Sequence, residues 1–411
     1  MRLLLPLTLA TLVVAAGCSK DKDIEPPAKI VAFPAKLEVK KVWGDGVGGG
    51  KKQIKLRLGL GPALDNELVF AASDKGHVVA VELKSGKTAW LKTFKKTKFS
   101  AGPAAGFGIV VLGTSKGQIF ALEETTGKQV WQARVNSELL SAPAIGETLV
   151  VMRSVDGRLH AFNVHTGAEV WSVEQQVPKL SLRGTATPVI AKDVAISGFD
   201  NGKVMAVSLS NGDTVWDTAL AAPHGRTELD RLVDIDCAVQ VVGENVFATG
   251  YQGRTAMLAL DSGQIWWSHD MSSYRGLAAD EDNLYISESD GELIALRQKD
   301  GAELWRNNKV RRRALSAPVV LKDSIALADF QGYVHFFDKA SGELIGRSRV
   351  SKQRVSSAPV GKGDTVVVMT DGGALAAFRT VPKGAAVARV PAPVLPPAPA
   401  EAPPAPTPTS P

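Results

Sequence analysis

A repeat of about 41 residues constrains the fold of this chain more than any other feature. Each copy opens with Pro ahead of an apolar run, has Gly 14 residues later and Trp 14 residues after that. Eight copies are present, two of them with Val or Leu in the Pro place and the seventh with Gly in the Trp place. In chain order they are Pro62/Gly76/Trp90, Pro103/Gly117/Trp131, Pro143/Gly157/Trp171, Pro188/Gly202/Trp216, Val239/Gly253/Trp267, Leu277/Gly291/Trp305, Pro318/Gly332/Gly346 and Pro359/Gly373.

In each copy, turns separate four short predicted strands. In residues 141–173, runs of alternating apolar residues are separated by turns at Gly146, Gly157 and Gly167. Glycine supplies the positive φ that tight hairpin turns need, and the period of two supplies a buried face. Four strands in a unit of this length are typical of a β-propeller blade. The sequence therefore predicts an all-β fold, an eight-bladed β-propeller of four-stranded antiparallel blades.

The eighth copy predicts how the ring closes. Its Trp place is Val387, in an Ala/Pro-rich stretch, whereas residues 37–43 at the other end of the chain alternate like an outer strand and end on Trp43. We expect residues 37–43 to complete blade eight, so that an N-terminal strand closes a propeller of residues 37–380 and leaves no open sheet edge. The repeat tryptophans are expected to be core, because a buried indole removes roughly 150 to 250 Å² from water.

The two ends of the chain have the composition of processing and linker segments. Residues 1–17 have a basic start and an apolar run too short to span a bilayer, which is typical of a signal peptide. The Ala-Ala-Gly-Cys motif ending at Cys18 resembles a bacterial lipobox, which implies cleavage before Cys18 and its lipidation, and Ser19 then points to the outer membrane. Residues 18–36 are expected to be a tether and residues 381–411, rich in Pro and Ala, a disordered tail.

Charge and cysteine content narrow the class of function. The net charge of +6 is modest, and no nucleic-acid motif accompanies it. The lysines of residues 92–98 and the run 311–313 fall between blades, where solvated loops are expected, with an anionic partner or lipid headgroup as the alternative. Cys237 has no partner once Cys18 is lipidated, so we expect a buried, inert thiol rather than a redox group.

The connections between blades vary in length. Trp171 to Pro188 spans 17 positions and Trp216 to Val239 spans 23, against 10 to 13 for the other blade-to-blade steps and 19 for the step from Trp43. All these connections emerge on one face, and the two long ones are neighbours. The first contains Lys-Leu-Ser-Leu-Arg-Gly and the second Glu-Leu-Asp-Arg-Leu-Val-Asp-Ile-Asp. Apolar side chains beside Arg and carboxylates favour a protein-binding surface. The alternative is that the leucines only pack the loop against the ring and bind no partner.

With the lipobox and the eight blades, these two stretches resemble the BamB family, lipoprotein subunits of the outer-membrane β-barrel assembly machine. The resemblance implies a non-enzymatic periplasmic scaffold, lipid-anchored to the outer membrane, that assists folding and insertion of outer-membrane proteins. It implies docking, as a monomer within the complex, onto a POTRA domain of BamA alongside the other subunits. Carried over by motif, the contact residues are Leu180, Leu182, Arg183, Asp234 and Asp236. Pairing of a loop with a POTRA sheet edge is the expected mode.

Two other functions remain open on the sequence. Quinone-dependent dehydrogenases share the Gly-to-Trp repeat, but they typically need a Ca²⁺ site, an Asp base and often adjacent cysteines. This chain has no adjacent cysteines, and its six histidines show no ligand spacing. We therefore expect no catalytic residues, no metal site and no cofactor. The third reading is an envelope scaffold with a different partner.

Overall fold

The computed structural model describes residues 25–47, 59–178, 180–182, 184–221, 226–227 and 232–384. Every named element in these ranges is a β-strand, and none of the described residues forms a helix able to cross a membrane. The expected signal peptide, Cys18 and residues 385–411 lie outside the described residues.

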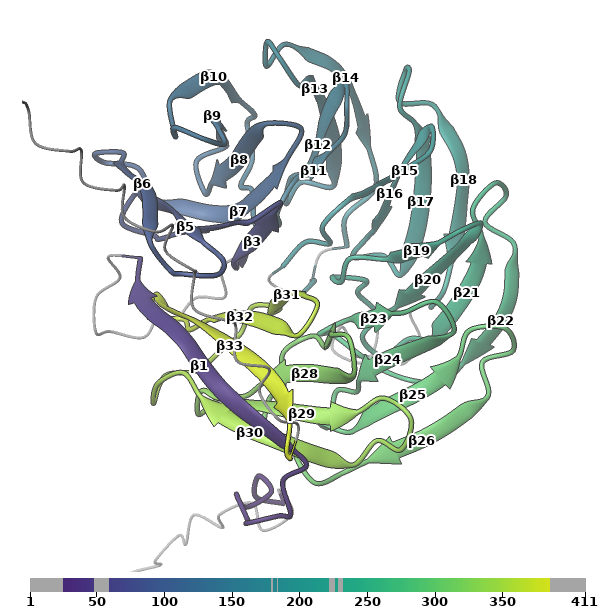
Figure 1. Cartoon of the computed structure of the whole chain (residues 1–411). Helices are drawn as coiled ribbons and strands as arrows, with labels where there is room; N and C mark the ends of the chain where they lie inside the picture. Colours follow the sequence, from purple (N-terminus) through teal and green to yellow (C-terminus); the bar gives the residue numbers. More distant parts are fainter. Residues whose placement is uncertain are drawn as a thin grey trace, which may run out of the picture.

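The strands form eight sheets that follow one another around a ring (Figure 1). Blade one contains β3 (Ala63–Asp65), β4 (Leu68–Ala72), β5 (His77–Glu82) and β6 (Thr88–Thr93); blade two contains β7 (Phe99–Gly106), β8 (Ile109–Thr114), β9 (Gln118–Glu123) and β10 (Gln129–Arg134), with the short β2 (Gly59–Leu60) parallel to β7. Blade three contains β11 (Ala144–Ile145), β12 (Leu149–Arg153), β13 (Arg158–Asn163) and β14 (Glu169–Glu174); blade four contains β15 (Val189–Ala191), β16 (Val194–Gly198), β17 (Lys203–Ser208) and β18 (Thr214–Ala219). Blade five contains β19 (Gln240–Val242), β20 (Asn245–Thr249), β21 (Thr255–Ala259) and β22 (Ile265–His269); blade six contains β23 (Leu277–Ala279), β24 (Asn283–Ser287), β25 (Leu293–Arg297) and β26 (Glu303–Asn307). Blade seven contains β27 (Val319–Val320), β28 (Ser324–Ala328), β29 (Tyr333–Asp338) and β30 (Leu344–Arg349); blade eight contains β31 (Val360–Lys362), β32 (Thr365–Met369), β33 (Ala374–Pro382) and β1 (Leu37–Gly46). The predicted eight-bladed propeller is confirmed.

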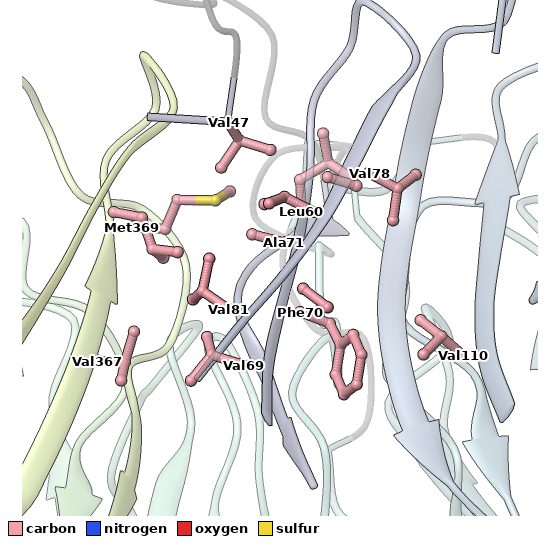
Figure 2. Packing of buried hydrophobic residues seen from close by; sticks show 14 of the residues in the cluster. Val47, Leu60, Val69, Phe70, Ala71, Val78, Val81, Val110, Val367 and Met369 are labelled. Carbon is pink, nitrogen blue, oxygen red and sulfur yellow. The ribbon is translucent and has the colours of Figure 1, made fainter. Parts of the chain in front are cut away.

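The N-terminal strand closes the ring, as predicted. β1 pairs antiparallel with β33, from Leu37 opposite Pro382 to Gly46 opposite Ala374 (Figure 1). Buried residues of blade one then pack on blade eight: Figure 2 shows a cluster in which Val69 and Val367 take part. Because β1 pairs with β33, the two ends of the chain share one sheet, and blade eight has four strands like the other blades.

A tryptophan joins each blade to the next at seven of the eight interfaces. In the outer strand β10 only Trp131 is buried, and its indole N–H donates to the carbonyl of Val164 in blade three over 2.8 Å. The ring lies over Gly167, where a Cβ would come within 2.6 Å of the indole. The same bond, 2.7 to 2.9 Å long, links Trp43 to Leu83, Trp90 to Glu124, Trp171 to Leu209, Trp216 to Leu260, Trp267 to Gln298 and Trp305 to Lys339.

The interface of blades seven and eight uses a different contact. Blade eight has no hairpin between its last two strands, since β33 and β1 come from opposite ends of the chain. Gly346 stands in the Trp place, and Leu37 and Val39 of the closing strand lie where its side chain would be, within 3.3 Å of a Cβ there. The departure from the repeat at Gly346 thus follows from how the ring is closed.

The segment before β1 is bound to the ring. Ala28 donates its N–H to the carbonyl of Arg311 over 3.0 Å, and Nη1 of Arg313 donates to the carbonyl of Ala28 over 2.8 Å. Arg313 is also paired with Asp329 over 2.7 Å, with both side chains at least 97 % buried. The expectation of a solvated loop is therefore wrong for Arg313, because the N-terminal segment 25–36 covers this part of blades six and seven.

Candidate docking site

The two long connections lie on the same face of the ring. In a blade of four alternating strands, the turn between the second and third strands and the connection to the next blade are on one side, which we call the connection face. Residues 175–188 join blade three to blade four, and residues 220–239 join blade four to blade five. We call the described residues of these two connections, 177, 178, 180–182, 184, 226, 227 and 232–236, together the docking surface.

The two connections are joined to each other. The backbone N–H of Leu182 donates to Oδ2 of Asp234. Gly184 lies against Asp236, since a Cβ on Gly184 would be 2.7 Å from Oδ2 of that carboxyl group. The predicted neighbourhood of the two stretches is thus present, and it depends on side-chain-to-backbone contacts rather than on strand pairing.

The second connection is in turn packed into the blades. Ile235 donates its N–H to the carbonyl of Phe199 over 3.2 Å, and its side chain occupies the space that a Cβ on Gly198 would need. On the other side, Tyr251 of blade five donates its N–H to the carbonyl of Asp234 over 2.7 Å. Residues 232–237 therefore form a buried base beneath the connection that carries Leu180.

The predicted contact residues divide into two groups. Leu180 is 39 % exposed and Leu182 is half-buried, whereas Asp234 and Asp236 are only 1 % and 9 % exposed. Asp234 accepts the N–H of Leu182 and Asp236 lies against Gly184, so both carboxyl groups lie beneath the first connection, and their contact with a partner stays a prediction. Arg183 lies outside the described residues.

Buried charges missed by the sequence reasoning lie under the same surface. Arg153, at the end of β12, pairs with Asp200 in the turn after β16, and its guanidinium lies 4.7 Å from the ring centroid of Phe199. Burial raises the pKa of Asp234 to about 7; the N–H of Leu182 opposes the rise, Asp236 and Asp200 add to it, and Arg153 opposes it. Nothing in the local sequence marks Arg153, because its partner comes from the next blade.

A central cavity of about 530 Å³ opens on the axis of the ring. Its lining comes from the starts of the inner strands, including the repeat prolines Pro62, Pro103, Pro318 and Pro359. Proline suits these places because an inner strand has one unpaired edge and loses no ladder hydrogen bond there. Cys237 also lines the cavity and is 6 % exposed, in agreement with the expected buried thiol.

An acidic cluster in blade six is explained by ion pairing. One oxygen each of Glu288, Asp290 and Glu292 lies within 4.8 Å of the others. Arg306 contacts Glu292 over 2.7 Å, and Arg311 contacts Asp290 over 2.9 Å. The three carboxyl groups are thus part of a salt-bridge network with these two guanidinium groups.

Fold and site together define the class: an eight-bladed β-propeller with a candidate protein-docking surface on one face. The family model described as outer membrane protein assembly factor BamB matches residues 74–307 and 290–386. The BamB of Pseudomonas aeruginosa is 41 % identical over 371 residues, covering 90 % of this chain and 97 % of the relative. This chain belongs to the BamB family.

Solved structures agree on the fold. The crystal structure of BamB from Moraxella catarrhalis superposes with a TM-score of 0.74 at 24 % identity, covering 83 % of this chain and all of that one. A quinohemoprotein alcohol dehydrogenase from Comamonas testosteroni has a TM-score of 0.67 at 11 % identity and covers 83 % of this chain and 76 % of that one. At such identities the likeness is one of fold alone, so the dehydrogenase carries no argument for oxidation chemistry here.

Proposed function

We propose that this chain is a non-enzymatic outer membrane protein assembly factor that docks onto a POTRA domain of a BamA-type protein through the docking surface. Membership in the BamB family supports the assembly role. The observation that best supports the docking site is the contact between the two long connections. Asp234 accepts the backbone N–H of Leu182, while Leu180 in the same connection is 39 % exposed. An exposed leucine on a braced loop is a suitable anchor for a partner's groove or sheet edge.

The proposal also assigns roles to the five contact residues of the sequence-based prediction. Leu180, Leu182 and Arg183 would contact the partner. Asp234 and Asp236 would act from below, by holding the first connection. Lipid attachment at Cys18 would anchor the protein to the outer membrane, facing the periplasm.

Binding to the isolated POTRA domains of a BamA homologue, measured by calorimetry, tests the docking site. The pair Leu180→Ser and Leu182→Ser should reduce affinity at least tenfold, because a lost apolar anchor is worth about 1.4 kcal/mol or more. Phe107→Ser is the matched control: Phe107 is 63 % exposed but lies in the hairpin between β7 and β8, on the opposite face. Wild-type affinity in the leucine pair would refute the docking site, as would equal losses in the pair and the control.

A further inference from the structure

Arg153 is a fully buried cation with an incomplete set of partners. Its side chain is 0 % exposed and reaches from the end of β12 to Asp200, which follows β16 in the next blade. Among the described residues, Nε and Nη1 of Arg153 have no hydrogen-bond partner. A buried ion pair is weak evidence for a stabilising role, because desolvation of the two charges offsets their attraction.

A continuous set of contacts leads from Arg153 to the docking surface. Arg153 stacks on Phe199, and the carbonyl of Phe199 accepts the N–H of Ile235. Asp234 precedes Ile235 and accepts the N–H of Leu182. Packing, hydrogen bonds and one peptide bond therefore join the guanidinium to the first connection.

Charge acts along the same route. The charges of Asp236 and Asp200 raise the pKa of Asp234, and the charge of Arg153 lowers it. Oδ1 of Asp234 has no hydrogen-bond partner among the described residues, so the amide of Leu182 and the charge of Arg153 are what favour its ionised form. An ionised carboxylate binds an N–H about twice as strongly as a neutral acceptor does.

We propose that Arg153 is a positioning residue for the docking surface, acting through Asp234 on the backbone of Leu182. The inference rests on the proposed function for its consequence, since a displaced Leu182 would present Leu180 wrongly to the partner. That Arg153 helps to hold the first connection in place depends only on the contacts described above.

Hydrogen exchange of the peptide spanning residues 177–186, followed by mass spectrometry, tests the structural part without a partner. Arg153→Met keeps an unbranched apolar stem and removes the guanidinium group with its charge, and it should speed exchange in this peptide about tenfold or more through the weakened Leu182 bond. Arg313→Met is the matched control, because it removes an equally buried Arg of an ion pair that lies beneath residues 25–36 instead. Exchange in residues 177–186 that is unchanged in Arg153→Met, or equally faster in both variants, would overturn the proposal.

The pH dependence of POTRA binding tests the consequence. Affinity of the unmodified protein should increase as pH rises from 6 to 8, because Asp234 ionises in this range and then holds Leu182 more firmly. In Arg153→Met the increase should move to higher pH, and in Asp234→Asn it should vanish. A destabilised fold without a positioning role would lower affinity at every pH alike, and that result would also overturn the proposal.

The two ideas fail in distinguishable ways. If the leucine pair loses binding while Arg153→Met keeps wild-type affinity, pH profile and exchange, the docking site stands and the positioning role falls. If the leucine pair binds normally, the docking site falls, and the exchange experiment still decides the role of Arg153. Should Arg153→Met fail to fold, Arg153→Lys replaces it: the charge remains while the planar stack on Phe199 is lost, and exchange should accelerate several-fold.

Discussion

Replacing one interblade tryptophan by alanine should show how much each contact between neighbouring blades contributes. Trp131 is 6 % exposed, and burial of an indole removes roughly 150 to 250 Å² from water. At about 25 cal/mol per Å² the gross loss is at most about 4 to 6 kcal/mol, and large-to-small substitutions at such sites cost about 3 to 5 kcal/mol. We expect Trp131→Ala to lower the free energy of unfolding by about 3 to 5 kcal/mol, including the lost bond to Val164.

Urea unfolding followed by circular dichroism measures this loss, with Trp266→Ala as the control. Trp266 is the tryptophan outside the repeat places and is 58 % exposed, so its loss should cost less than about 1 kcal/mol. Gly167→Ala completes a double-mutant cycle: its Cβ would meet the indole of Trp131 at 2.6 Å, and that clash disappears once the indole is gone. A cost for Trp131→Ala no larger than that for Trp266→Ala, or strict additivity with Gly167→Ala, would refute the reasoning.

Three further predictions follow from closure, burial and close packing. Deleting residues 25–46 should abolish the cooperative thermal transition seen by calorimetry, because blade eight loses β1; a transition at the wild-type temperature would contradict closure. Folding raises the pKa of Asp234 to about 7, so the stabilisation from its protonated form is complete below the unfolded pKa and is lost as pH rises from about 4 to 7. The free energy of unfolding should fall by at most ~1.4 kcal/mol per pH unit in this range. Urea titrations at several pH values should show a smaller fall with pH in Asp234→Asn, and an identical fall would contradict the prediction. Gly184→Ala should weaken POTRA binding with little change in melting temperature, because a Cβ would press on Asp236; unaltered binding would show that the first connection tolerates displacement.

Much of the fold could be predicted because the repeat is local. Fourteen-residue steps place each hairpin and each outer-strand Trp within a single blade, and the closing strand is missing from one end of the chain and present at the other. That each indole lies against a Gly of the next blade, as Trp131 does against Gly167, was seen only in the structure. Why Gly346 replaces Trp became clear only from the split of blade eight between the two chain ends.

The candidate site was only partly predictable. Loop length and composition located the two connections, but they did not separate exposed residues from buried ones. Leu180 is exposed while Asp234 is buried, opposite to what their side-chain polarity suggests. The carboxyl group of Asp234 accepts the backbone N–H of Leu182, which is 52 positions away in the chain, so local sequence does not reveal this contact.

The sequence by itself determined the blade, the number of blades and the closure of the ring, because hairpin turns and alternating strands are encoded within a few residues of one another. The tertiary structure alone decided which side chains of the long connections face outward and which hold them from below. It also decided that Arg153 and Arg313 are buried. These outcomes depend on contacts between blades, where desolvation and charge pairing are set by residues that are distant in the chain.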